Sequence, residues 1–215
     1  MIAFKLAIKN LIGAGLRTWL NVFVLSLSYV IIIWYSGIIE GWNRQARRDT
    51  INWQVGGGQY WQENYDPYDP FTLTESHAHI PTEFRSLIKE GEMTPLLLSQ
   101  GTIYPEGRMQ SVLIKGIDPA QDILKIPSHL LKGGENVIPA LIGKRMASST
   151  HMKKGDFVTL RWRDVNGTFD AGDAEIMDIF DSTVPMVDNG QIWVPLQRLQ
   201  EMTQMKDQAT LLVTA

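Results

Sequence analysis

Residues 19–39, WLNVFVLSLSYVIIIWYSGII, decide how this chain is organised, because no charged residue interrupts them. A helix rises about 1.5 Å per residue, so this stretch is long enough to cross a hydrocarbon core of about 30 Å. A buried helix of a soluble protein would normally keep one polar face. The stretch therefore predicts a membrane-spanning helix, which we place at residues 17–42.

Basic and aromatic residues border the apolar stretch. Amphipathic rings prefer the headgroup level of a bilayer, and basic side chains mark its ends. We predict a membrane-interface set consisting of Lys5, Lys9, Arg17, Trp19, Trp34, Tyr35 and Trp42. Lys and Arg are balanced on the two sides, with Arg44, Arg47 and Arg48 following the stretch. The α-amino group tips the balance and favours a cytoplasmic N-terminus.

A cleaved signal peptide is the alternative interpretation of this region. It requires a shorter apolar core and small residues at the cleavage site. Here the stretch ends in Trp34-Tyr35-Ser36-Gly37, with Tyr where a small residue is needed. Length and flanks therefore favour a permanent anchor.

Residues 1–16 predict a separate amphipathic helix. Its apolar surface is broad, and Lys5 and Lys9 lie four residues apart on one polar stripe. Such a helix lies in the cytoplasmic interface, with its lysines near anionic headgroups. Gly13-Ala14-Gly15 then predicts a bend into the spanning helix.

One face of the spanning helix includes three polar residues among positions at i+3/i+4 spacing: Asn21, Leu25, Ser28, Ile32 and Ser36. Intramembrane Ser and Asn ordinarily pack against other helices. A wall of a substrate cavity is the other interpretation, and packing is favoured.

Residues 43–215 predict one α+β external domain of mostly antiparallel strands. The expected strands are 51–60, 96–104, 110–116, 137–141, 157–163, 174–180, 191–195 and 209–213, and the expected helices are 82–90, 143–149 and 196–202. Pro105-Glu106-Gly107 predicts a hairpin between 96–104 and 110–116, and Asn166-Gly167 predicts a type I′ hairpin turn. Residues 157–163 alternate, with Phe157, Thr159 and Arg161 on one side and Val158, Leu160 and Trp162 on the other. Because the last strand runs to the end of the sequence at Ala215, we expect the chain to be part of a longer protein.

The sequence contains few candidate catalytic, metal-binding or cofactor-binding residues. There is no cysteine and the net charge is −3, which excludes thiol chemistry and disfavours a nucleic-acid surface. His77 and His79 beside Glu75 lack the further ligands that a zinc site needs. Gly56-Gly57-Gly58 is not followed by the Lys of a phosphate loop. We therefore predict no catalytic, cofactor or metal residues, and no cofactor.

Four segments, in order, resemble the permeases of MacB/FtsX-type ABC transporters. Residues 4–11 and 16–20 (FKLAIKNL, LRTWL) are similar to the family's N-terminal "LAxRNLxRxxxRTxL" pattern. Residues 114–119 (IKGIDP) resemble a segment of the lipoprotein-releasing LolC/LolE branch. The other matching segments are LIGKRMA at 141–147 with KGDFVTL at 154–160, and QIWVPL at 191–196 with Leu199-Gln200.

The resemblance implies a permease fragment in a bacterial inner membrane, with the N-terminus cytoplasmic and a periplasmic or extracellular domain of two subdomains. A cytoplasmic ABC ATPase hydrolyses ATP, and the permease, which has no catalytic residues, transmits motion that extrudes or releases an amphiphile such as a lipoprotein. A second permease subunit and a periplasmic chaperone are further implied partners. The hairpin around Asn166 is shorter than the hook that captures a chaperone in this family.

Family members carry three further membrane helices after the external domain. Because these are not among the 215 residues, we expect this chain alone neither to bind the ATPase normally nor to transport. The main alternative is a single-pass anchor that carries a ligand-binding or adaptor domain. A membrane-tethered hydrolase is the third class considered.

Overall fold

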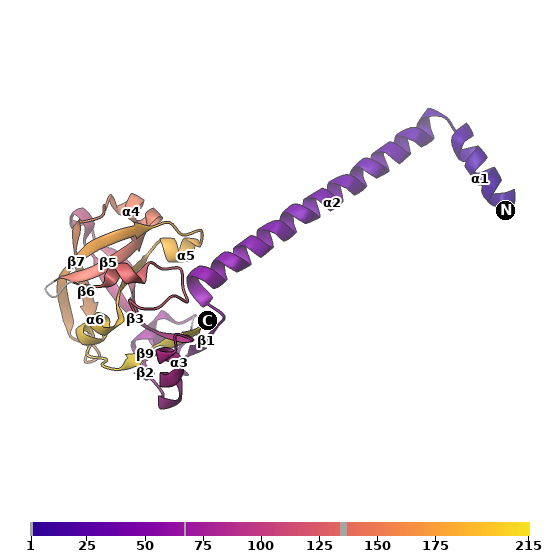
Figure 1. The fold of residues 1–215 in the computed structure, drawn as a ribbon. Helices are drawn as coiled ribbons and strands as arrows, with labels where there is room; N and C mark the ends of the chain where they lie inside the picture. The colour runs from indigo at the N-terminus through magenta and orange to yellow at the C-terminus, as the bar shows by residue number, and fades with distance from the viewer. Residues whose placement is uncertain (1, 67, 134–136) are drawn as a thin grey trace. The chain divides into compact units, whose positions relative to one another are not determined.

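The computed structural model describes residues 2–66, 68–133 and 137–215 (Figure 1). The chain forms two compact units, Met1–Arg47 and Arg48–Ala215. The first is helical and the second is a mixed α+β domain. The predicted class, an N-terminal apolar helix followed by an α+β domain, is therefore confirmed.

Two helices make up the N-terminal unit. Helix α1 spans Ile2–Gly13, and α2 begins at Leu16 and continues to Thr50. A turn separates them at Ala14 and Gly15, where Gly15 adopts φ +66°, so the predicted break is present. Helix α2 has 35 residues, which corresponds to about 50 Å and exceeds the thickness of a hydrocarbon core.

The segment after α2 differs from the predicted strand at 51–60. Residues Ile51–Val55 form a π-helical turn, η1, and the strand β1 is confined to Gly58–Trp61. The backbone N–H of Gly56 donates to the carbonyl of Ile51, five residues earlier, at 2.8 Å. Trp53 stacks on Phe180 with ring centroids 5.9 Å apart. Packing of this ring onto the domain favours the helical turn over an extended strand.

The α+β domain contains one large sheet in the order β1-β10-β3-β4-β8-β5-β7-β6. An additional pairing of β3 with β6 closes the last six of these strands into a barrel. In chain order, the strands of this sheet after β1 are Met93–Ile103 (β3), Gln110–Ile117 (β4), Ile138–Gly143 (β5), Phe157–Arg163 (β6), Phe169–Phe180 (β7), Gln191–Pro195 (β8) and Leu211–Thr214 (β10). A small second sheet pairs β2 (Ala78–His79) with β9 (Gln208–Ala209).

Antiparallel pairing predominates, as predicted. The parallel pairs are β4–β8 and β5–β7, whose chain connections pass through other elements. The β3–β4 hairpin turns through Pro105–Gly107, as the turn residues indicated. The β6–β7 hairpin is present as well. Its turn is not type I′, because Gly167 has a positive φ whereas Asn166 does not.

Side-chain alternation produces two cores. Along β6, Val158, Leu160 and Trp162 are buried while the residues between them are exposed. The inner cluster fills the barrel with residues such as Ile114, Leu160 and Ile192. An outer cluster covers the other face of β3, β4 and β8 and includes Trp193. Burial of this much apolar surface stabilises the domain independently of any membrane.

Short helices cover the barrel. These are η2 (Pro70–Thr74), η3 (Thr82–Phe84), α3 (Arg85–Lys89), η5 (Ser128–Leu131), α4 (Lys144–Thr150), α5 (Pro185–Asp188) and α6 (Leu196–Met202). Buried Asp188 accepts hydrogen bonds from the backbone N–H groups of Lys144 and Arg145, at 2.8 and 3.2 Å. The carboxylate thereby satisfies orphan donors at the start of α4.

Candidate functional site: the apolar helix, its junction and two grooves

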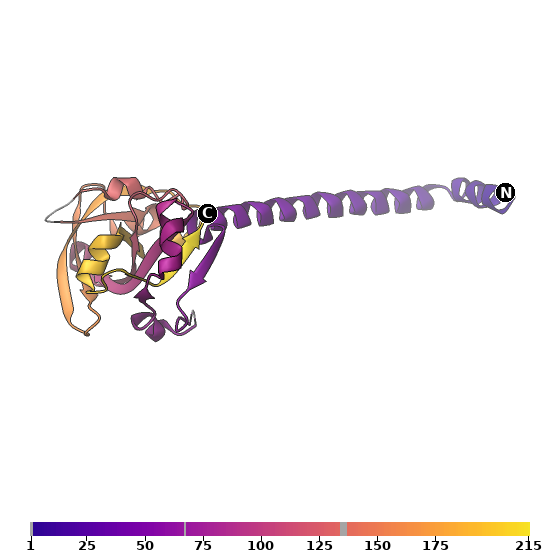
Figure 2. The same cartoon turned by 60° about the horizontal axis from the view of Figure 1, so that its bottom comes forward.

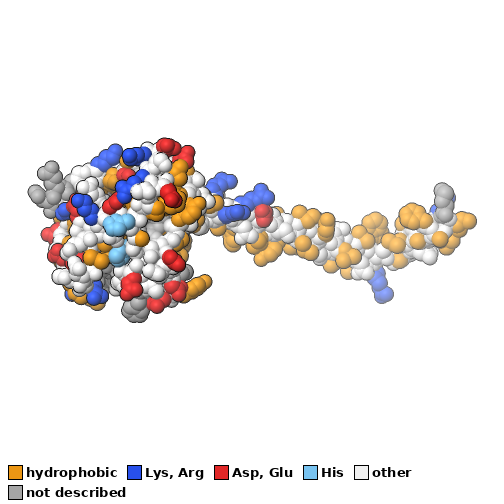
Figure 3. Space-filling model, turned by 90° about the horizontal axis from the view of Figure 1, so that it is seen from below, with side chains coloured by type: hydrophobic (Ala, Val, Ile, Leu, Met, Phe, Trp, Pro, Cys, Tyr) orange, Lys and Arg blue, Asp and Glu red, His pale blue; other side chains and the backbone are white. Residues whose placement is uncertain are grey.

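Helix α2 presents its apolar side chains without protein cover (Figure 3). The aromatic residues of the predicted interface set are all exposed: Trp19, Trp34, Tyr35 and Trp42. In the described chain, it is the single helix long and apolar enough to cross a membrane. A bare apolar helix of this length is stable where lipid or other helices cover it.

The remaining interface residues are basic. Lys5 and Lys9 lie one turn apart on α1, and Arg17 lies in the first turn of α2. Their side chains are exposed. Contact with headgroups stays a prediction for the whole interface set.

The predicted packing face is also exposed at Asn21, Leu25, Ser28, Ile32 and Ser36. Their spacing places them on one side of α2. The hydroxyl of Ser28 donates to the carbonyl of Val24 at 2.8 Å, so its hydrogen is satisfied within α2 while its oxygen can still accept. Packing at this face also stays a prediction.

The junction after α2 is attached to the end of the domain's last strand. The N–H of Gly57 donates to the carbonyl of Thr214 at 2.9 Å, and β1 pairs with β10 in the register Gly58↔Thr214. The N–H of Lys125 donates to the carbonyl of Asn52 at 2.9 Å. The C-terminus consequently lies beside the segment that follows α2 (Figures 1 and 2). The first strand of the large sheet and the last strand of the domain therefore lie side by side.

Glycines permit this close approach. A Cβ on Gly57 would lie 2.2 Å from the carbonyl oxygen of Ala215, and one on Gly56 would lie 2.5 Å from that of Thr214. Both distances are shorter than any side chain tolerates, so the junction depends on bare backbone.

We expect Gly56→Ala to destabilise the domain by about 1–3 kcal/mol more than Gly91→Ala. Both glycines have positive φ, +66° and +79°, but a Cβ on Gly91 meets nothing within 4 Å. The control therefore carries a positive φ without the overlap. Denaturant unfolding followed by tryptophan fluorescence measures the difference. Equal losses in the two variants would contradict the close packing.

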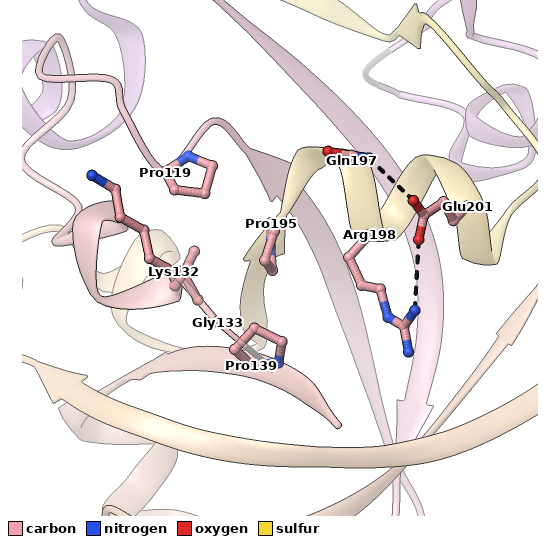
Figure 4. Close-up of a pocket in the computed structure, with 9 residues that line it drawn as sticks. Pro119, Lys132, Gly133, Pro139, Pro195, Gln197, Arg198 and Glu201 are labelled. Carbon is pink, nitrogen blue, oxygen red and sulfur yellow. Dashed lines mark hydrogen bonds and ion pairs between the residues drawn. The ribbon is translucent and has the colours of Figure 1, made fainter. Parts of the chain in front are cut away.

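A first groove, of about 580 Å³, lies between the 119–133 segment and α6 (Figure 4). Pro119, Pro139 and Pro195 supply rigid walls. Figure 4 shows Gln197 and Arg198 both directed to Glu201, at 3.3 and 3.6 Å. Glu201, the acid among the residues that line this groove, is thus held by two neighbours on its own helix.

A second groove, of about 1060 Å³, crosses the outer face of β3, β4 and β6. The exposed arginines Arg161 and Arg163 line it beside Phe169. The guanidinium of Arg161 lies 4.2 Å from the centre of the Phe169 ring, and that of Arg163 lies 5.9 Å from it. The alternation in 157–163 places Arg161 on the side opposite Leu160 and Trp162, but it does not indicate the groove, which requires three strands to meet.

Lys115 is a buried cation that sequence analysis missed. It lies on the outer face of β4, with Nζ 4.9 Å from the centre of the Trp193 ring. Burial lowers the pKa of its ammonium group to about 8. The other residues of 110–117 are mostly apolar, and this pattern could have indicated that Lys115 is buried.

The histidines do not form a cluster of ligands. His77 Nδ1 lies 2.5 Å from Gln208 Oε1, and His79 lies on β2 opposite Gln208. Across the described ranges, no three residues of the His, Cys, Asp or Glu type are placed to hold a metal ion.

Comparisons with known proteins give likenesses to solved structures at low sequence identity. No family model and no curated protein matches the sequence. A similar solved structure is the extracellular domain of the noncanonic ABC-type transporter YknZ from Gram-positive bacteria. Its TM-score is 0.41 at 10% identity, and the match covers 74% of this chain and 80% of that chain. A TM-score of 0.41 at 10% identity assigns no function to this chain.

Proposed function

We propose that the chain is part of the permease subunit of a MacB/FtsX-type ABC transporter, of the LolC/LolE-like branch. Four sequence segments in family order support this assignment. The succession of a lysine-bearing helix, a long apolar helix and an α+β domain supports it as well. The proposed location is a bacterial inner membrane, with the N-terminus cytoplasmic and the domain periplasmic or extracellular.

The observation that carries the proposal is the junction of β1 with β10. Motion from a cytoplasmic ATPase can reach an external domain only through the membrane segments. Gly57, which follows α2 and the short turn η1, is hydrogen-bonded to Thr214, so any chain that continues from Ala215 starts beside the segment that leaves α2. Paired membrane segments would then move the domain from a single attachment point.

The proposed role is mechanical. The permease couples ATP hydrolysis by a separate cytoplasmic subunit to movement of its external domain, and so extrudes or releases an amphiphile such as a lipoprotein. A second permease subunit completes the transporter. The helix face of Asn21 and Ser28 is the proposed contact with neighbouring helices.

The topology is tested by cysteine labelling, because the natural chain contains no cysteine. Ala3→Cys and Lys153→Cys are expressed separately and treated in spheroplasts with a membrane-impermeant maleimide. We expect Lys153→Cys to react at once and Ala3→Cys to react only after permeabilisation. Labelling in the reverse order would reject the proposal.

The partnership is tested with the full-length protein that includes the implied further membrane helices. We expect it to co-purify with an ABC-type ATPase whose turnover rises when the amphiphile is added. A chain that binds its ligand without any ATPase supports the alternative, a membrane-anchored ligand-binding or adaptor domain.

A further inference from the structure

The groove on the outer face of β3, β4 and β6 has the size and lining of a binding site. Its volume of about 1060 Å³ is at the upper end of the range for small-molecule pockets. Outward-facing positions on adjacent strands form its floor, including Leu98 of β3 and Leu113 of β4. Phe169 and Met205 add apolar surface at its sides.

Two guanidinium groups are held in this groove. Arg161 and Arg163 are next-but-one neighbours on β6, so they share its outer face at a spacing of about 7 Å. Arg163 Nε donates to the carbonyl of Gly167 at 3.0 Å. A Cβ on Gly167 would lie 2.7 Å from a terminal nitrogen of Arg163. Glycine at the hairpin turn therefore lets Arg163 settle in one orientation.

The charge of these arginines is not compensated. Over the described residues, neither guanidinium lies within ion-pair distance of a carboxylate. The acid next in sequence, Asp164, already accepts from the backbone N–H groups of Asn166 and Thr168 and from Gln204. Glu75 is the other acid that lines the groove, and it pairs with neither arginine. Two like charges close together favour an anionic ligand.

We propose that this groove binds a single-chain amphiphile with a phosphate head. The phosphate lies between Arg161 and Arg163, whose planar forks match phosphate oxygens, and the alkyl chain lies over Leu98, Leu113 and Phe169. The biological meaning of the site rests on the proposed transport function, which it deepens by giving the amphiphile a head-group charge and a place on the domain.

Binding is measured on the full chain in phosphatidylcholine nanodiscs. Radiolabelled octyl phosphate, below its micelle concentration, is equilibrated by dialysis, and empty nanodiscs correct for partition into lipid. We expect Arg161→Gln or Arg163→Gln to weaken binding about tenfold, and both together about a hundredfold. Lys153→Gln, which removes an exposed positive charge elsewhere, should leave the affinity unchanged.

Further measurements separate the contributions of the protein's charge, the phosphate head and the alkyl chain to the affinity. Arg161→Lys with Arg163→Lys keeps the charge and should retain binding within about tenfold. Inorganic phosphate and octyltrimethylammonium should each bind at least about tenfold more weakly than octyl phosphate. The inference is overturned if either binds as tightly, if Lys153→Gln weakens binding as much as the double variant does, or if octyl phosphate does not bind.

The two proposals fail separately. Loss of octyl phosphate binding with the expected cysteine labelling rejects the groove alone. Labelling of Lys153→Cys from the cytoplasmic side rejects the transporter assignment, whatever the groove binds.

Discussion

Replacing Lys115 by Met raises the stability of the α+β domain at pH 7 by about 1–3 kcal/mol. The difference between the ordinary pKa of 10.5 and the folded value of about 8 corresponds to about 3 kcal/mol of desolvation cost. The face of the Trp193 ring, 4.9 Å from Nζ, offsets part of that cost, by about 1–2 kcal/mol. Met retains the packing of the alkyl chain without the charge.

The gain depends on pH in a defined direction. Between about pH 8 and pH 10.5 the unfolded chain keeps the Lys115 proton that the folded domain releases, so wild-type stability rises with pH. Below about pH 8 both states are protonated and the full cost remains. The advantage of Lys115→Met should therefore be constant below pH 8 and shrink as pH rises towards 10.5. Denaturant unfolding of both proteins across this range measures the difference, and other titrating groups cancel.

A surface lysine provides the control for this prediction. Lys153→Met removes a charge from an exposed position and should change stability by less than about 0.5 kcal/mol. A wild-type domain at least as stable as Lys115→Met at pH 7 would contradict the cost assigned to the buried ammonium.

Arginine in place of Val30 should abolish stable membrane insertion in a large share of molecules. Val30 lies near the middle of residues 19–39, where Arg costs about 2.5–3.5 kcal/mol while an aliphatic residue gains a few tenths. Extraction at alkaline pH, followed by sedimentation, separates inserted from released protein. We expect a shift of the variant to the released fraction.

The same residue placed outside the apolar stretch tests whether depth matters. Gly41→Arg adds a charge next to Glu40, beyond residues 19–39, and should stay in the membrane pellet. If Val30→Arg and Gly41→Arg remain in the pellet equally, the helix is not held by a hydrocarbon core.

Local patterns predicted the elements whose signals are contained within a few residues. The alternation in 157–163 predicted β6 with its bounds and its two alternating sides, because a period of two depends on neighbours alone. The turn residues at 105–107 predicted the β3–β4 hairpin for a similar reason. The α4 and α6 helices were also predicted within one residue at each end.

Long-range packing decided the parts that local patterns missed. Residues 51–55 have strand-like composition, but stacking of Trp53 on Phe180 favours the helical turn. The closure of β3 on β6 joins residues almost 60 positions apart in sequence, and no local signal specifies it. The second groove also depends on long-range packing. Arg161, Leu98 and Leu113 line one surface only because β3, β4 and β6 lie side by side.

The pairing of β1 with β10 makes the domain's response to force depend on direction. A pull that carries Gly57 and Ala215 together runs along the strands and loads the β10–β3 ladder in shear, so several hydrogen bonds resist at once. A pull that parts them peels β1 from β10, and the pairs yield one after another. The β10–β3 hydrogen bonds thus resist common motion together, whereas the β1–β10 hydrogen bonds break in sequence when the two ends are separated.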